Sequence, residues 1–133
     1  MNNNEGKRLL MLDDSEDLLW LLKIFFEEKG YEVKSILDGD KIFSAIESFQ
    51  PDILLMDVLL NGSDGRTICQ SLRAQPQTRH LGILLTSASP QNLKDYKNYR
   101  ADDCIEKPFD LSLLDQKINS ILSWLPIRRK ALQ

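Results

Sequence analysis

Five polar residues whose side chains could share a chemical task stand where predicted strands end. They are Asp13, Asp14, Asp57, Thr86 and Lys107. The apolar run RLLML precedes the acidic pair, ILLM precedes Asp57, and ILLT ends in the threonine. Ligands of an open parallel sheet bind in the crevice at the carboxyl ends of its strands, where the strand order reverses. The spacing therefore predicts that these side chains meet in one site.

The carboxylates of Asp13, Asp14 and Asp57 predict a cation site. If the first and third strands are neighbours, about 4.8 Å apart, the carboxylates converge and repel one another unless a cation or protons relieve them. Carboxylate oxygens and water suit Mg²⁺, which also takes phosphate oxygens as ligands. Lys107 and Thr86 would add a positive charge and a hydrogen-bond donor for an anion beside the metal. The set is typical of a phosphoryl-transfer site in which Asp57 accepts the phosphoryl group.

Each residue taken alone also has a simpler interpretation. Asp14 can cap the helix that follows it, Lys107 can be an ordinary surface lysine, and Thr86 can be a β-branched strand residue. The lone His80, between Arg79 and Leu81 in a predicted loop, is interpreted as a surface residue with no partner. Cys69 is interpreted as a small buried filler.

Composition limits the class of protein. The chain has 133 residues, which favours a single domain, and it is 42% hydrophobic and 28% charged, as in globular proteins with a sizeable core. Its net charge of -3, with scattered basic residues, disfavours direct binding to nucleic acid. The distant Cys69 and Cys104 are expected to be reduced. Because no signal peptide and no long apolar run is present, we expect a soluble, cytoplasmic protein with no membrane contact.

Apolar runs of strand length alternate with segments of helical period, a pattern typical of an α/β fold with a parallel sheet. The predicted strands are 8–12, 31–37, 53–56, 83–86 and 104–105. The run 53–56 has no polar alternation, which predicts a central strand, whereas the partly polar 31–37 suits an edge. Helices are predicted over 15–29, around 42–49, around 68–72, from Ser89-Pro90 onward, and over 111–125.

The ends of the chain are predicted to lie outside the domain. We expect residues 1–6 to be disordered, residues 7–125 to form the domain, and Pro126 to end the last helix. Residues 126–133, with the basic run Arg128-Arg129-Lys130, would form a solvated tail or the start of a linker. Trp124 falls off the buried stripe of the last helix, so it marks either a self-association or partner surface or a partly covered surface aromatic.

The motifs MLDDSED, LLMDVLLNGSDG, LLTSAS and IEKPF occur in the order and approximate spacing of a known family. Over roughly residues 7–125, the chain resembles the receiver domain of two-component response regulators, in particular the single-domain, chemotaxis-type members. This resemblance implies a flavodoxin-like, doubly wound, five-stranded parallel sheet of order 2-1-3-4-5 with helices on both faces. It also implies phosphorylation of Asp57 by the phosphohistidine of a sensor histidine kinase or phosphotransfer protein, or by a small phosphodonor.

The resemblance also assigns roles within the site. It implies that Asp14 and Asp57 bind Mg²⁺ directly, that Asp13 acts mainly through water, and that the main-chain carbonyl of Leu59 completes the protein ligands. It implies a cis peptide bond between Lys107 and Pro108.

Several positions depart from the family pattern. Cys104 stands where many receivers carry a Tyr or Phe that swings inward during switching, so another or a weaker route of switching is expected. Asn61 replaces a common proline and Arg100 a common glycine, which affects expected loop geometry rather than chemistry. Leu59 and Ala88 occupy positions that tune hydrolysis, and neither side chain can orient a water molecule, which predicts slow loss of the phosphoryl group.

The sequence favours a phosphorylation-controlled signalling switch that acts through an unknown downstream protein and is not a dedicated enzyme. We expect a monomer or a weak, phosphorylation-dependent dimer. One alternative is a receiver-like interaction scaffold without phosphotransfer, against which the complete acidic triad argues. Another is a phosphatase of the haloacid dehalogenase type, which needs a second Asp two residues after the nucleophile, where this chain has Leu59.

Overall fold

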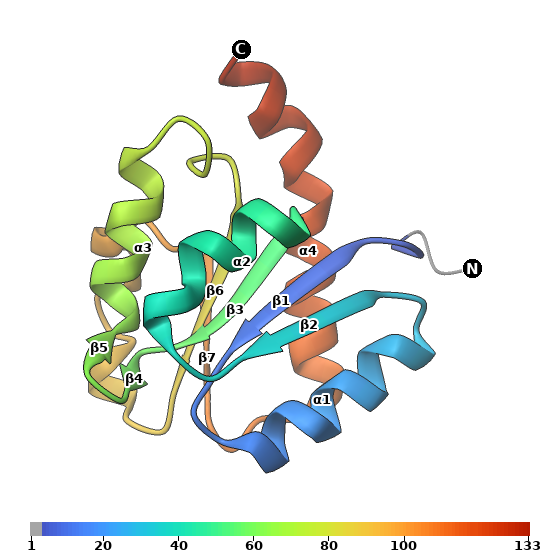
Figure 1. Ribbon diagram of the computed structural model, residues 1–133, viewed down its shortest axis with the longest axis vertical. Helices are drawn as coiled ribbons and strands as arrows, with labels where there is room; N and C mark the ends of the chain where they lie inside the picture. The colour runs from blue at the N-terminus through green and yellow to red at the C-terminus, as the bar shows by residue number, and fades with distance from the viewer. Residues whose placement is uncertain (1–3) are drawn as a thin grey trace.

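A five-stranded parallel sheet forms the centre of the computed structural model, which describes residues 4–133 (Figure 1). Its strand order is β2-β1-β3-β6-β7, and β4 and β5 form a small separate hairpin. Counted within the sheet alone, this is the predicted 2-1-3-4-5 order, so the predicted α/β class and strand order are confirmed. The strands of the sheet are β1 (Arg8–Leu12), β2 (Glu32–Ile36), β3 (Ile53–Asp57), β6 (Gly82–Ser87) and β7 (Asp103–Glu106). As predicted, β3 is central and completely buried, and β2 lies at an edge.

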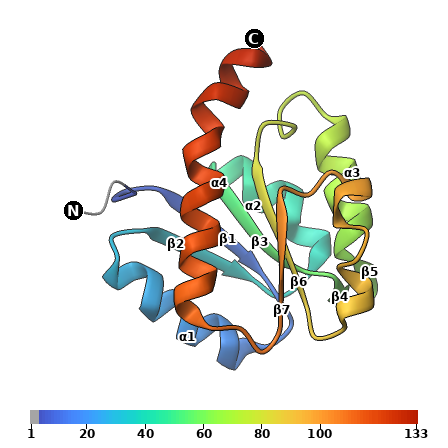
Figure 2. The same ribbon diagram turned by 180° about the vertical axis from the view of Figure 1, so that it is seen from behind.

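Helices cover both faces of the sheet (Figure 2). The helices are α1 (Glu16–Glu28), α2 (Ile42–Phe49), α3 (Gly65–Ala74) and α4 (Leu111–Ala131). Alternate residues of the strands point to opposite faces. Leu9 and Met11 pack in the core shared with α1 and α4, whereas Leu10 and Leu12 pack in the core shared with α2 and α3. Burial on both faces explains why the central strands are continuous apolar runs.

Local signals set the helix boundaries near the acidic pair. Ser15, rather than Asp14, caps α1, because its side-chain oxygen accepts a hydrogen bond from the Leu18 backbone N–H. The helix ends before Gly30, whose φ of 95° suits glycine. The Gly6 backbone N–H donates to the Gly30 carbonyl at 2.8 Å. Residues 4–6 therefore form a turn against the domain instead of the predicted disorder, and residues 1–3 lie outside the described part.

The predicted fourth helix does not form. Two short 3-10 turns, η2 (Pro90–Asn92) and η3 (Tyr96–Tyr99), replace it, and Ser89 makes no side-chain capping hydrogen bond. The segment is rich in Asn, Asp and Tyr, which are weak helix formers, and neither turn contains a buried residue. Because the segment lacks a broad apolar face, packing against the sheet does not compensate for its low helix propensity, and only isolated turns form.

The last helix passes through Pro126 and continues to Ala131, so the prediction that this proline ends it was wrong. Proline in a helix interior costs about 3 kcal/mol, and contacts beyond it must compensate. Arg128 forms an ion pair with Asp102 and donates to the Leu81 carbonyl at 3.1 Å, and Arg129 lies 3.2 Å from a carboxylate oxygen of Asp52. The basic run is therefore helical and attached to the domain, and is not a solvated tail.

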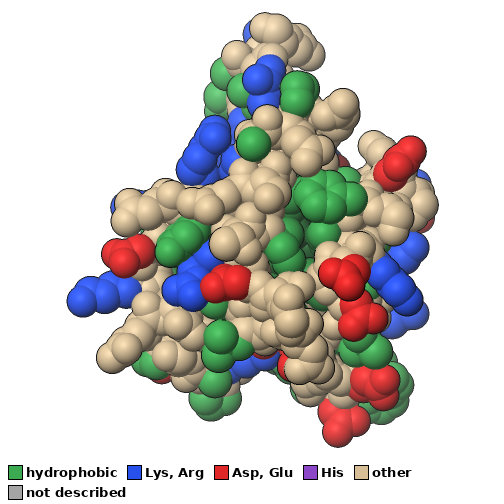
Figure 3. All heavy atoms as spheres, turned by 60° about the vertical axis from the view of Figure 1, so that its left-hand side comes forward, with side chains coloured by type: hydrophobic (Ala, Val, Ile, Leu, Met, Phe, Trp, Pro, Cys, Tyr) green, Lys and Arg blue, Asp and Glu red, His purple; other side chains and the backbone are tan. Residues whose placement is uncertain are grey.

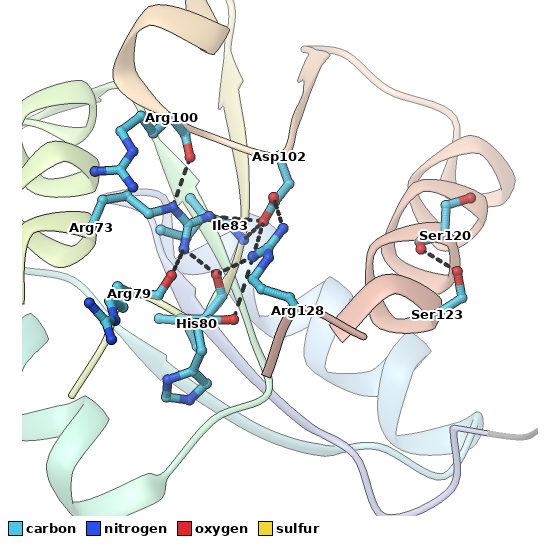
Figure 4. Close-up of polar contacts among 10 residues, drawn as sticks. Arg73, Arg79, His80, Ile83, Arg100, Asp102, Ser120, Ser123 and Arg128 are labelled. Atoms are coloured by element: carbon cyan, nitrogen blue, oxygen red, sulfur yellow. Dashed lines mark hydrogen bonds and ion pairs between the residues drawn. The ribbon is translucent and has the colours of Figure 1, made fainter. Parts of the chain in front are cut away.

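Arg73, Asp102 and Arg128, which we name the Asp102 clamp, lie at the edge of the sheet where β6 begins (Figure 4). The Asp102 carboxylate accepts from both guanidinium groups and from the Ile83 backbone N–H at 2.8 Å. The Arg73 side chain is only 5% exposed. His80, half-buried at the same edge, contributes its backbone carbonyl to Arg128, and its pKa is lowered by burial and by nearby arginines.

Arg100 adopts a left-handed backbone conformation with φ of 65°, which glycine would adopt without strain. A non-glycine residue pays a cost of order 1 kcal/mol for this conformation. The Arg73 Nε–H donates to the Arg100 carbonyl at 2.8 Å, so the clamp holds the turn in place.

Among residues 4–133, no helix has the length and apolar character that a membrane span requires.

Candidate functional site

Four strand ends of the sheet bring the predicted site residues together. Asp13 directly follows β1, Asp57 ends β3, Thr86 lies near the end of β6, and Lys107 directly follows β7. Asp57 and Thr86 are paired in register on adjacent strands. The predicted convergence at the carboxyl edge of the sheet is present in the structure.

The carboxylates of Asp13, Asp14 and Asp57 form a cluster in which one oxygen of each lies within 4.8 Å of the others. Asp13 and Asp57 are buried, at 4% and 6% exposure, whereas Asp14 is exposed. The Ser15 backbone N–H donates to Asp13 Oδ1 at 2.9 Å, which fixes that side chain as the chain turns into α1. Three carboxylates at the rim of a buried crevice form a hard oxygen donor set, and such a set fits Mg²⁺ with water completing its shell.

Lys107 bridges the two buried carboxylates. Its Nζ donates to Asp13 Oδ2 at 2.6 Å and to Asp57 Oδ2 at 2.7 Å. Its backbone N–H donates to the Ser87 carbonyl at 2.9 Å, and the Lys107-Pro108 peptide bond is cis, as the resemblance implied. Lys107 is therefore not an ordinary surface lysine, because its charge is held inside the acidic cluster.

Burial and charge act in opposite directions on this cluster. Desolvation by burial raises the pKa of Asp57 above its ordinary value, although hydrogen bonding and charge from Lys107 act to lower it. For Lys107, desolvation acts to lower the pKa, but hydrogen bonds and charge from Asp13 and Asp57 outweigh it and the pKa is raised. The ammonium group thus stays charged and partly neutralises carboxylates that would otherwise repel one another.

Thr86 is 2% exposed, and its Oγ1 is the buried side-chain oxygen for which the described residues supply no hydrogen-bond partner. A buried hydroxyl without a partner costs about 1–3 kcal/mol. The hydroxyl lies on the strand beside Asp57, so a group bound at the Asp57 carboxylate is in a position to satisfy it. This orphaned hydroxyl is an independent sign that the crevice accommodates an anion.

A small hairpin beside the cluster was not predicted. It consists of β4 (Leu59–Leu60) and β5 (Ser63–Asp64), joined through Asn61 and Gly62, whose φ is 73°. The Leu59 backbone N–H donates to Asp57 Oδ1 at 3.1 Å, and the Leu59 side chain is 55% exposed at the mouth. The hairpin therefore orients the Asp57 carboxylate from the outer side.

Gly65 supports Asp57 from behind, a role that sequence reasoning missed. A Cβ atom at this position would lie 2.3 Å from the Asp57 carbonyl oxygen, so only glycine permits the approach of α3. The Gly65 N–H donates to the Val58 carbonyl at 2.8 Å. The sequence shows a glycine eight residues after Asp57, but the reason for it, the close packing of α3 against the Asp57 backbone, is visible only in the structure.

Cys104 lies half-buried beside a hollow of about 410 Å³ that Pro90, Leu93 and Glu106 also line. Burial raises the pKa of its thiol. Cys69, as interpreted, is fully buried, and desolvation raises its pKa to about 11. No thiol of the described residues contributes to the acidic cluster.

Comparisons with known proteins agree with this geometry. The profile of the response regulator receiver domain family matches residues 9–119. The chain is 32% identical over 117 residues to the DNA-binding dual master transcriptional regulator RpaA of a Synechocystis strain, covering 86% of this chain and 48% of RpaA. It is 31% identical to the phosphate regulon regulator PhoB of Rhizobium meliloti, covering 86% of this chain and 52% of PhoB. The chain thus spans about half the length of these relatives.

Among solved structures, the response regulator TrrA of Thermotoga maritima, in complex with Mg(2+)-BeF, is 25% identical with a TM-score of 0.78, over 86% of this chain and 98% of that one. With the family profile covering residues 9–119 and the acidic crevice formed at the strand ends, the chain belongs to the family of response regulator receiver domains.

Proposed function

We propose that the chain is a phosphorylation-controlled signalling switch in which Asp57 accepts the phosphoryl group. The observation that carries this proposal is the acidic cluster itself, with the buried Asp57 hydrogen-bonded to Lys107 beside the unpartnered hydroxyl of Thr86. The donor is the phosphohistidine of a sensor histidine kinase or phosphotransfer protein, or a small phosphodonor.

Asp14 and Asp57 would hold Mg²⁺ directly, Asp13 through water, and the main-chain carbonyl of Leu59 would complete the protein ligands. When bound, the cation stabilises the negative charge that develops on the transferred group. The similar response regulator TrrA was solved in complex with Mg(2+)-BeF, and the three clustered carboxylates of this chain offer oxygen donors that suit the same cation.

In the transfer step, a carboxylate oxygen of Asp57 attacks phosphorus as the bond from phosphorus to the donor nitrogen or oxygen breaks, and the donor leaves with that electron pair. The Leu59 N–H holds Oδ1, which orients the carboxylate for the attack. Lys107 already contacts Oδ2 and would follow the negative charge onto the phosphoryl oxygens. Thr86 would then donate its hydroxyl to the same group.

The movement of Thr86 would be transmitted to the neighbouring segment of η2, η3 and β7. Cys104 has no ring to swing inward, so switching would remodel the two 3-10 turns instead of rotating an aromatic side chain. The output is recognition by a downstream protein. On the face in Figure 3, basic side chains occur in separate groups among acidic ones, which supports a protein partner over a nucleic-acid backbone.

Mass spectrometry after treatment with acetyl phosphate and Mg²⁺ tests the proposal. The wild type should gain one phosphoryl group, and Asp57→Asn should gain none, because an amide oxygen is a poor nucleophile. Asp38→Asn, which removes an exposed carboxylate just after β2, is the matched control and should be labelled like wild type. Equal labelling of Asp57→Asn would show that another residue accepts the phosphoryl group. An unlabelled wild type that binds Mg²⁺ would favour a scaffold that works without phosphotransfer.

A further inference from the structure

Arg66 stands in the first turn of α3, where a basic side chain does not stabilise a helix. The amino end of a helix carries partial positive charge, so acidic side chains are favoured there and basic ones are not. The Asp64 carboxylate, just before this turn, caps the helix by accepting from the Arg66 backbone N–H at 2.8 Å. The Arg66 side chain is not needed for that cap, so its position has to be explained by contacts outside the helix.

The Arg66 guanidinium connects the β4-β5 hairpin to the turn η3. Its Nη2 lies 2.7 Å from Asp64 Oδ2 and its Nε lies 3.1 Å from Asp64 Oδ1, which makes a two-pronged ion pair of fixed geometry. Its Cζ lies 5.5 Å from the centre of the Tyr99 ring, within the range of a cation–π contact. Asp64 belongs to β5 and Tyr99 to η3, and Figure 2 shows α3 beside both the hairpin and the orange turns that precede β7.

The same hairpin holds the Asp57 carboxylate. The Leu59 backbone N–H donates to Asp57 Oδ1, and Leu59 is paired with Asp64 across the hairpin. Each strand of the hairpin has only two residues, and so short a hairpin depends on outside contacts for its position. The ion pair of Arg66 with Asp64 is such a contact. A chain of contacts therefore runs from Asp57 through Leu59, Asp64 and Arg66 to Tyr99.

We propose that Arg66 is a positioning residue for Asp57 and that its contact with Tyr99 couples this carboxylate to η3, an inference that rests on the proposed phosphorylation of Asp57. With Arg66 in place, the hairpin presents the Leu59 N–H to the carboxylate. Transfer of a phosphoryl group removes the charge of the Asp57 carboxylate and weakens this hydrogen bond, because a bond to an ionised acceptor is about twice as strong as one to a neutral acceptor. The hairpin is then free to shift, and Arg66 transmits the shift to the Tyr99 ring.

This connection supplies the switching segment with an aromatic side chain although Cys104 has none. Tyr99 is half-buried, and the residue after it is held by the Asp102 clamp, because the Arg73 Nε–H donates to the Arg100 carbonyl. The turn η3 itself contains no buried residue that would resist a change. A displacement of the Arg66 guanidinium would therefore move the Tyr99 ring against a fixed end of η3, in addition to any change that reaches the segment from Thr86.

Initial rates of Asp57 labelling by acetyl phosphate and Mg²⁺, followed by mass spectrometry, test the positioning role. Arg66→Ala should slow labelling at least about threefold, because the Asp57 carboxylate is less well oriented. Tyr99→Leu should also slow it, whereas Tyr99→Phe keeps the ring and should react like wild type. Arg79→Ala, which removes an exposed arginine from the loop before β6, is the matched control. In the Arg66→Ala background, Tyr99→Leu should have no further effect, as a direct contact requires.

Amide hydrogen exchange of the peptides that cover η3 tests the coupling. Phosphorylation should change their exchange in the wild type, and Arg66→Ala should reduce that change by at least about half when compared at equal extents of labelling. Circular dichroism confirms that each variant is folded. Equal labelling rates of Arg66→Ala and wild type, or an undiminished exchange response in Arg66→Ala, would each overturn the inference. A wild type that takes up no phosphoryl group would overturn the proposed function and this inference with it, so the two failures are distinguishable.

Discussion

Replacing Asp102 with alanine should destabilise the domain more than any single change at its surface. The Asp102 carboxylate is 9% exposed and serves the guanidinium groups of Arg73 and Arg128, whose side chains are 5% and 23% exposed. It also accepts from the Ile83 backbone N–H. Its removal leaves one buried cation without a counter-ion and one buried N–H without an acceptor.

Removing one member of a buried ion pair costs about 3–5 kcal/mol. The lower end applies here, because Arg73 keeps hydrogen bonds to the carbonyls of Arg79, Leu81 and Arg100. We expect Asp102→Ala to lower the free energy of unfolding by about 3 kcal/mol. Arg128→Ala should cost only ~1 kcal/mol, since its side chain is more exposed and Asp102 keeps Arg73.

Urea unfolding followed by circular dichroism measures these differences. With a slope of about 2 kcal/mol per molar, the loss for Asp102→Ala corresponds to a midpoint lower by roughly 1.5 M. Asp102→Asn retains an acceptor for Ile83 but not the charge, and should fall between wild type and Asp102→Ala. If the free energy of unfolding of Asp102→Ala lies within about 1 kcal/mol of the wild-type value, the Asp102 clamp does not stabilise the domain as we infer.

Three further predictions concern the site and a buried phenol. Mg²⁺ should raise the melting temperature of the wild type, because it relieves carboxylate repulsion, and Asp14→Ala should remove most of that rise in thermal scans. Leu59→Asn or Ala88→Glu should speed decay of phospho-Asp57, measured in purified protein, and equal decay rates would exclude missing water orientation as the cause of slow hydrolysis. Burial raises the pKa of Tyr31 to about 12. Because the folded state retains this proton longer, stability should fall between pH 10 and 12 more steeply in wild type than in Tyr31→Phe, as urea midpoints will show.

The strands and the acidic crevice could be predicted because both depend on features that are local in sequence. Continuous apolar runs such as 53–56 require cover on both faces, and a parallel sheet then brings the residues after each run to one edge. Asp57 and Lys107 are 50 positions apart, yet their meeting follows from topology alone.

The C-terminal part of α4 could not be predicted in the same way. Pro126 is a strong local signal for a helix end, and it is outweighed by contacts of Arg128 with residues 26 and 47 positions away. The role of Asp102 was hidden for the same reason, since its partners come from α3, β6 and α4. The helix predicted from Ser89-Pro90 onward failed for the opposite reason. Its local start signal was good, but the residues that follow offer too little apolar surface to stabilise a helix by packing.

The 3-10 turns η2 and η3 connect β6, the strand that carries Thr86, to β7. Their hydrogen bonds join residues three apart, as from the Leu93 N–H to the Pro90 carbonyl and from the Arg100 N–H to the Lys97 carbonyl. Leu93 is the buried anchor between the two turns, at 6% exposure. Such segments open with a small free energy, so their amide hydrogens exchange with solvent long before those of β3. In the proposed switch, a change at Thr86 would therefore rearrange this segment at a lower free-energy cost than it would rearrange the buried strands.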